Sequence, residues 1–194
     1  MTMTTRFRFD ADRVAYFEKA GWEAYYDRRW LRVLTLMVQL NRAQFAMSWL
    51  GAISAAWDVV RATKAFAPID NDLAQTQRHL TDFYAKARRS VQIHADAATL
   101  AALEVDYWVV HRQLAIRRQQ HPDEGDVEPM VSALEKLHQA LFAGAPAAMR
   151  TSAEWRARAA VAVDRITGKR STDVAADWRE VEADLQRAYR TVQE

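Results

Sequence analysis

The residues best equipped for chemistry lie together on one predicted helix in the middle of the chain. Glu104, Tyr107 and His111 follow one another at intervals of three and four residues, which places a carboxylate, a phenol and an imidazole along one helical face. Leu100 and Leu114 share that face, so we expect it to be buried. A buried carboxylate needs a cation, a hydrogen-bond donor or a metal. Glu104, His111 and Tyr107 are therefore the candidate catalytic residues, for oxidation or proton transfer.

Two other predicted helices carry side chains of the same kinds. Glu23 precedes Tyr26 at the spacing that separates the carboxylate and the phenol just described. Glu135 and His138 form an E-x-x-H sequence, and this spacing lets both side chains reach one ion. Helices that each present such groups are how a bundle builds a metal site. The candidate metal ligands are Glu23, Glu104, His111, Glu135 and His138.

In these three segments the chain resembles the ferritin-like di-iron carboxylate proteins. Their bundles supply one Glu from each of two helices and an E-x-x-H from each of two others. The resemblance implies a helical bundle that holds iron or another divalent metal and acts as a metal-dependent oxidoreductase. Only Glu135 and His138 complete the motif here, because Tyr107 and Tyr26 stand where a second His would be.

A structural role is the alternative for the same side chains. An Arg or Tyr from a neighbouring helix would then satisfy both Glu104 and His111, Glu135 would be a solvated charge, and His138 would be a hydrogen-bonded residue at the edge of the core. Two functions follow from these alternatives. The first is a bundle with an internal pocket of Trp, Tyr and Met that binds a small-molecule ligand or a metal. The second is a non-catalytic helical interaction protein, a subunit of a homo-oligomer or of a larger assembly.

The composition excludes several classes of active site. The chain has only five Gly and no Cys in 194 residues. Widely spaced glycines cannot form a phosphate-binding loop, and a chain without Cys has no thiolate nucleophile, zinc finger or disulfide. The 27 cationic residues barely outnumber the 25 acidic ones. We therefore expect no nucleic-acid binding.

The apolar periodicity predicts an all-α fold, a single-domain bundle of about six or seven helices over residues 1–194. Residues 1–9 are expected to form a flexible N-terminal tail. Asp10, Asp70 and Asp96 are predicted to cap helices, and Thr151 with Glu154 is predicted to form a capping box. The predicted helices begin or lie at 10–48, 52–66, 70–91, 96–120, 127–143 and 151–168, with a last one from 172 or 173.

Residues 43–60 are mostly apolar, and Asp58 is their only charged member. We interpret this stretch as a buried bundle helix, with a segment lying along a membrane as the alternative. Four of the seven Trp lie within the span of the first two predicted helices, where they are expected to fill gaps between helices or to border polar groups. The N-terminus lacks a secretory pattern. The expectation is a cytoplasmic protein without stable membrane insertion.

Overall fold

Eight α-helices make up the regular structure in the computed structural model, which describes residues 8–121 and 126–194. No strand occurs in these two ranges. The all-α prediction is confirmed, and the predicted number of six or seven helices is too low. The helices are α1 (Ala11–Tyr26), α2 (Trp30–Phe45), α3 (Trp49–Phe66), α4 (Leu73–Ser90), α5 (Ala97–Gln120), α6 (Glu128–Phe142), α7 (Pro146–Thr167) and α8 (Val174–Thr191).

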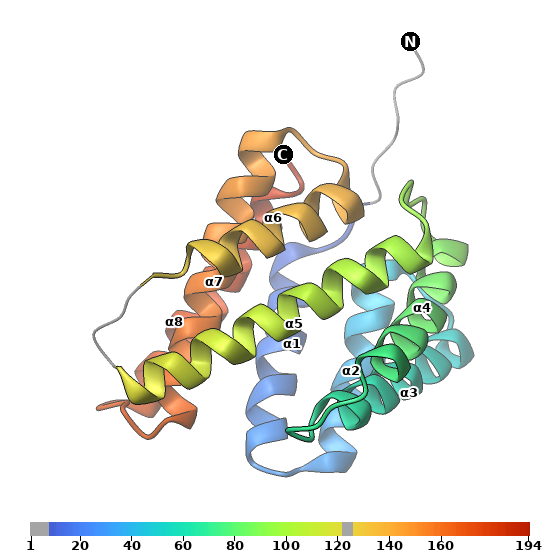
Figure 1. Ribbon diagram of the computed structural model, residues 1–194. Helices are drawn as coiled ribbons and strands as arrows, with labels where there is room; N and C mark the ends of the chain where they lie inside the picture. The colour runs from blue at the N-terminus through green and yellow to red at the C-terminus, as the bar shows by residue number, and fades with distance from the viewer. Residues whose placement is uncertain (1–7, 122–125) are drawn as a thin grey trace.

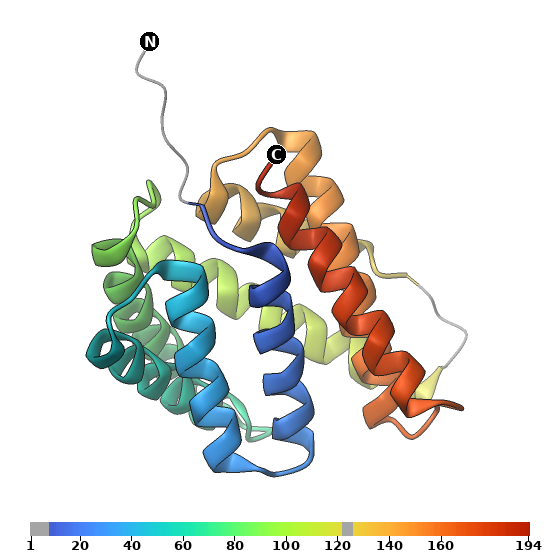
Figure 2. The same ribbon diagram turned by 180° about the vertical axis from the view of Figure 1, so that it is seen from behind.

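The helices are arranged as a closed ring. Each one packs against the next in the chain, and α8 returns to pack against α1 (Figure 1). Figure 2 shows α1 between α2 and α8. The longest helix, α5, is roughly 36 Å long at 1.5 Å per residue and connects α4 on one side of the molecule with α6 on the other. Side chains from both halves of the chain therefore meet at the centre.

Aspartate side chains begin four of the helices. Asp10, Asp72, Asp96 and Asp173 each accept a hydrogen bond from the backbone N–H three residues further on, which satisfies a donor that the helix itself leaves free. Asp10 and Asp96 agree with the prediction, and Asp173 is one of the two residues at which the last helix was expected to begin. The helix α4 starts after Asp72 instead of Asp70.

The predicted long helix over residues 10–48 is wrong, because the chain turns between α1 and α2. Arg28 adopts a left-handed conformation with φ of 58°. The backbone N–H of Arg29 donates to the carbonyl of Ala24 at 2.8 Å, the hydrogen bond that closes a Schellman motif. The turn leaves Tyr26 and Trp30 about half exposed, although both were expected on the buried stripe.

Two further helix starts differ from the prediction. Ser48 caps α3, so this helix begins three residues before residue 52. Thr151 lies inside α7 and caps nothing, because Pro146 occupies the first position of that helix. A proline there needs no hydrogen-bond partner for its nitrogen, and a helix can begin at it without a capping side chain.

The core lies where the two halves of the ring meet. The largest of the fully buried side chains come from α4 to α8, among them Leu80, Leu100, Leu134, Met149 and Leu185. The predicted inner stripe of the last helix is buried as expected.

The predicted N-terminal tail falls largely outside the described residues. Of its last two members, Phe9 lies against two rings of the core, those of Phe142 and Tyr189, with ring centroids 6.0 and 5.8 Å away. In the described ranges, none of the helices combines the length and the apolar character that crossing a membrane requires.

Gly21 provides a test of helix energetics. Nothing lies within 4 Å of a Cβ built at Gly21, which is in the interior of α1. We expect Gly21→Ala to raise the free energy of unfolding by about 0.5–1 kcal/mol, because alanine loses less backbone entropy in a helix. Thermal denaturation should show a Tm about 2 °C higher. Gly168→Ala is the matched control, since its Cβ would lie 2.9 Å from the carbonyl oxygen of Asp164. An equal gain from both substitutions would contradict this account.

Candidate functional site

A buried ion pair joins three helices at the centre of the molecule. Arg156 of α7 donates through Nη2 to Oε1 of Glu18 on α1 at 2.6 Å, and through Nη1 to Oε2 at 3.2 Å. The hydroxyl of Tyr189 on α8 accepts from Nη1 of the arginine at 2.6 Å and donates to Glu18. Glu18 is only 7 % exposed. This carboxylate is therefore held by a forked, charge-assisted contact and a phenol.

Glu104 lies beside this ion pair and has its own donors. The hydroxyl of Tyr84 on α4 donates to Oε2 at 2.8 Å, and Nε1 of Trp108 donates to Oε1 at the same distance. The charge of Glu104 also favours the charged form of Arg156, so the two groups interact electrostatically. Glu104 thus has a tyrosine from a neighbouring helix as one of its partners.

Three buried tyrosines at this centre are held in their neutral form. Burial, followed by the charge of Glu104, raises the pKa of Tyr84 well above its usual value. Burial also raises the pKa of Tyr107 and of Tyr189. A group whose pKa is displaced away from neutrality is poorly placed to exchange protons near pH 7. These phenols are suited to donate hydrogen bonds.

His111 contacts a different carboxylate. Its Nε2 lies 3.2 Å from Oδ1 of Asp164 on α7, and Arg118 donates to the other oxygen of that aspartate. Burial favours a higher pKa for Asp164, but the contacts with His111 and Arg118 outweigh it and lower the pKa. The imidazole also stacks on the ring of Tyr107, with centroids 5.8 Å apart. The structure therefore brings Tyr107 and His111 together, while Glu104 is bound elsewhere on the same helix.

The other predicted metal ligands lie in separate parts of the molecule. Glu23 forms an ion pair with Lys19 at 3.5 Å on the surface of α1. Glu135 pairs with Arg150 at 3.3 Å in an outer network that includes Glu128 and Glu154. His138 faces inward instead, is 3 % exposed, and contacts the ring of Phe142.

Among residues 8–121 and 126–194, no three His, Asp or Glu side chains lie close enough together to hold a metal ion. The structure therefore does not gather Glu23, Glu104, His111, Glu135 and His138 around one point. The two members of the E-x-x-H sequence diverge, one toward solvent and one toward the core. Binding of a small ligand or of iron, and the catalytic roles of Glu104, His111 and Tyr107, stay predictions.

A second candidate site lies on the outside of α3. On this helix the small residues face the core and the large apolar residues face outward. The residues that α3 buries completely are alanines: Ala52, Ala55, Ala56 and Ala62. Its exposed side carries Trp49, Leu50, Ile53 and Trp57, each about half exposed or more. Residues three and four apart adjoin on a helix, so these side chains form one continuous apolar surface. The interpretation of residues 43–60 as a buried helix is therefore wrong for this face.

Cations border this apolar surface. The guanidinium of Arg42 lies over the ring of Trp49 at 3.8 Å, and that of Arg61 lies 5.6 Å from the ring of Trp57. Lys64 follows one turn later on the exposed side. We call Trp49, Leu50, Ile53, Trp57, Arg61 and Lys64 the outer face of α3.

Exposed apolar residues and cations also occur at the start of α2. Trp30 and Leu31, at the start of α2, are exposed, and the ring of Trp30 packs edge-on against Tyr25 at 5.6 Å. Between residues 28 and 66 the sequence has six cations and one acid, Asp58. That acid is buried and paired with Lys86 of α4. The exposed charges of α3 are therefore all positive.

Sequence reasoning missed the residues that anchor the centre. Glu18 was not considered, although it stands four residues after Val14 on the buried side of α1. Arg156 was not considered either, and it lies among buried alanines of α7. A charged residue among small residues on one helix face was the available sign of a buried ion pair. The two residues can pair only because their helices are adjacent, and a local sequence pattern does not show which helices are adjacent.

Removal of the central carboxylate should destabilise the fold strongly. We expect Glu18→Gln to lower the free energy of unfolding by about 3 kcal/mol, because it leaves the charge of Arg156 in the interior without its counter-ion. Glu135→Gln is the control, since the exposed Arg150 keeps two other carboxylates, and its effect should stay below about 1 kcal/mol. Urea denaturation measures both. Similar costs for the two substitutions would contradict the central role of the buried pair.

The burial of His138 should make the stability of the protein depend on pH. Burial, with a contribution from the charge of Arg156, lowers the pKa of His138 to about 3. The unfolded chain binds this proton near pH 6.5, so stability is lost as the pH falls below that value. Between pH 7 and pH 5 the loss from this residue should be about 2 kcal/mol. Denaturation at both pH values should show this loss in the wild type and not in His138→Met. Equal pH dependence of the two proteins would refute the assignment.

The chain was compared with known proteins at three levels. No protein-family model matches it, and neither the curated proteins nor the solved structures contain a significant match. Its function has therefore to be argued from its own side chains.

Proposed function

We propose that this protein is a non-catalytic helical interaction protein that docks onto an anionic partner through the outer face of α3. The observation that carries the proposal is the distribution of side chains on that helix. Alanines face the core, and the exposed side carries Trp49, Leu50, Ile53 and Trp57. Monomeric soluble proteins rarely expose a continuous apolar surface of this kind, and such surfaces mark interaction sites.

The choice of an anionic partner rests on charge. Arg61 and Lys64 extend the apolar surface, and the single acid of α3 is buried. A second copy of the chain fits this face poorly, because a two-fold interface would place the cations of both copies near one another. An acidic partner would instead gain favourable electrostatics along the whole face.

The buried centre supports the same proposal. The carboxylates of Glu18 and Glu104 receive their hydrogen bonds from side chains of the protein itself. Such a network holds helices together and does so without a ligand. The predicted ligand- or metal-binding function is the second candidate, favoured by the unpartnered Nδ1 of the buried His138.

The proposed function is tested by removing the apolar part of the face. We expect the double substitution Trp49→Ser with Trp57→Ser to leave the fold intact, because both side chains are half exposed. It should reduce binding to anionic probes at least about tenfold, since exposed Trp residues carry much of the energy of an interface. The probes are polyglutamate and vesicles that contain phosphatidylserine, with dissociation constants measured by titration and the fold checked by circular dichroism.

Ile116→Ser is the control, because Ile116 is a similarly exposed apolar residue on another helix, α5. It should bind both probes as the wild type does. A wild type that binds neither probe, or a double variant that binds as tightly as the wild type, would reject the proposed function. A wild type that dimerises and loses the dimer in the double variant would show that the occupant is a second copy.

A further inference from the structure

We infer that the anionic partner of the outer face of α3 is the headgroup surface of a membrane, on which the protein lies without crossing it. This inference rests on the proposed function and names its partner. An acidic protein surface is the competing occupant. Three features of the face favour lipid: its side chains project, its aromatic residues are tryptophans beside cations, and its exposed charges are positive.

Two leucines, one on the outer face of α3 and one on α2, stand clear of their surroundings. Leu50 on α3 is 83 % exposed, and Leu31 at the start of α2 is 85 % exposed. A side chain that lines a groove would be covered on two sides by its walls. The helix of a partner protein is usually received in such a groove. A leucine that projects in this way is better suited to enter the boundary between headgroups and acyl chains.

The tryptophans are placed as interfacial residues. Trp30, Trp49 and Trp57 are each about half exposed, and Trp is enriched at the level of the headgroups because its ring is apolar while its N–H is polar. Arg42 and Arg61 lie against two of these rings. A ring at the headgroup level would therefore bring a guanidinium to the phosphates.

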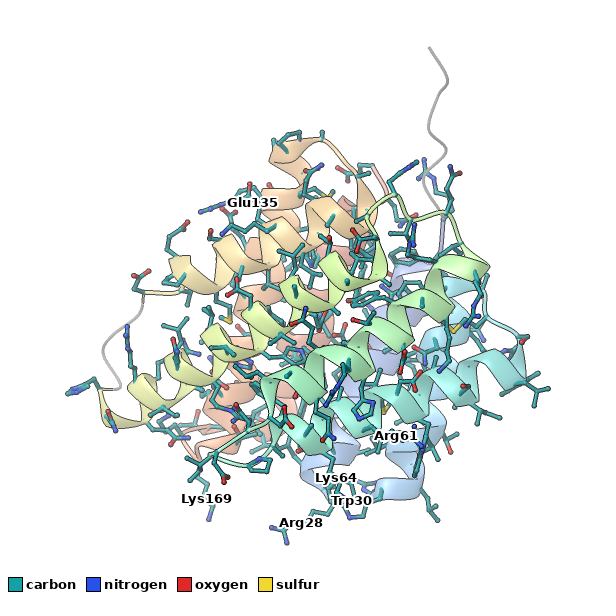
Figure 3. The ribbon with its side chains drawn as sticks, turned by 45° about the vertical axis from the view of Figure 1, so that its right-hand side comes forward. Arg28, Trp30, Arg61, Lys64, Glu135 and Lys169 are labelled. Carbon is teal, nitrogen blue, oxygen red and sulfur yellow. The ribbon has the colours of Figure 1, made fainter. Side chains whose placement is uncertain are left out.

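The charge of the molecule is unevenly distributed. Residues 28–66 carry six cations against one acid, so the rest of the chain has more acids than cations. In Figure 3, Arg28, Trp30, Arg61 and Lys64 lie along the lower part of the molecule, and Glu135 lies on the upper side. Anionic lipids attract such a basic surface and repel the acidic remainder. The protein would thus approach a membrane with α3 first.

A helix of this kind would lie in the plane of the interface. Its 18 residues extend over about 27 Å, and one side is apolar along the first half and basic along the second. Helices with an apolar face and a cationic border bind the headgroup region by burying the apolar side chains while the cations stay in contact with phosphate. The alanines on the other side keep α3 attached to the bundle during this contact.

The experiment is co-sedimentation of the full chain with vesicles. We expect the wild type to bind vesicles of phosphatidylcholine and phosphatidylserine and to bind phosphatidylcholine alone at least tenfold more weakly. Arg61→Glu with Lys64→Glu should weaken binding to the anionic vesicles by more than about thirtyfold, because each cation near such a surface contributes about fivefold. Leu50→Ser should weaken binding to vesicles and leave binding to polyglutamate unchanged, since only a bilayer receives the leucine.

Two controls complete the experiment. Lys136→Glu reverses an exposed cation on α6 and should leave vesicle binding within about twofold of the wild type. Brominated lipids should quench tryptophan fluorescence in the wild type, and less so in Trp57→Phe. Binding to polyglutamate without binding to vesicles would overturn the membrane inference and leave the proposed function standing. Vesicle binding that Leu50→Ser and Trp57→Phe do not change would also overturn it, because adsorption would then be electrostatic alone.

Discussion

The buried ion pair between Glu18 and Arg156 is the interaction on which closure of the helical ring depends. Glu18 lies on α1, Arg156 on α7, and Tyr189 brings α8 to the same point. An arrangement in which α1 packed elsewhere would leave the buried guanidinium of Arg156 without its carboxylate, which costs several kcal/mol. The charge of Glu104 acts on the same guanidinium, and its donor Tyr84 draws in α4. Arg156 thus interacts with side chains on helices from both halves of the chain.

Most helix ends were predicted to within one residue, because a proline, a glycine or a polar loop follows them in the sequence, as after Phe66, Gln120 and Phe142. Aspartate caps act through a side chain that the sequence displays, so Asp10 and Asp96 could be identified directly. The two ends that were missed, those of α1 and α2, are followed by left-handed residues other than glycine, Arg28 and Ala46. Nothing in the residue type marks such an end. This is why the turn between α1 and α2 was missed and one helix too few was expected.

The polar centre was predictable only in part, and the outer face of α3 was not. A carboxylate on an apolar helix face already indicates a buried partner, which was correct for Glu104. The identity of the partner depends on which helices are neighbours, so Tyr84 could not be deduced. In α3 both faces are apolar, alanine on one and Trp49 and Trp57 on the other. Periodicity shows that two such faces exist without showing which of them is inside.

The separation of the central residues along the chain also sets the order in which the protein can assemble during synthesis. Glu18 precedes Arg156 by 138 residues and Tyr189 by 171. Helices α2 to α5 contact their neighbours in sequence and can pair as they leave the ribosome. The first helix has no counter-ion at that stage, so its carboxylate stays in water and α1 remains undocked on that side. Translation must reach the last helix before the first one can take its final place.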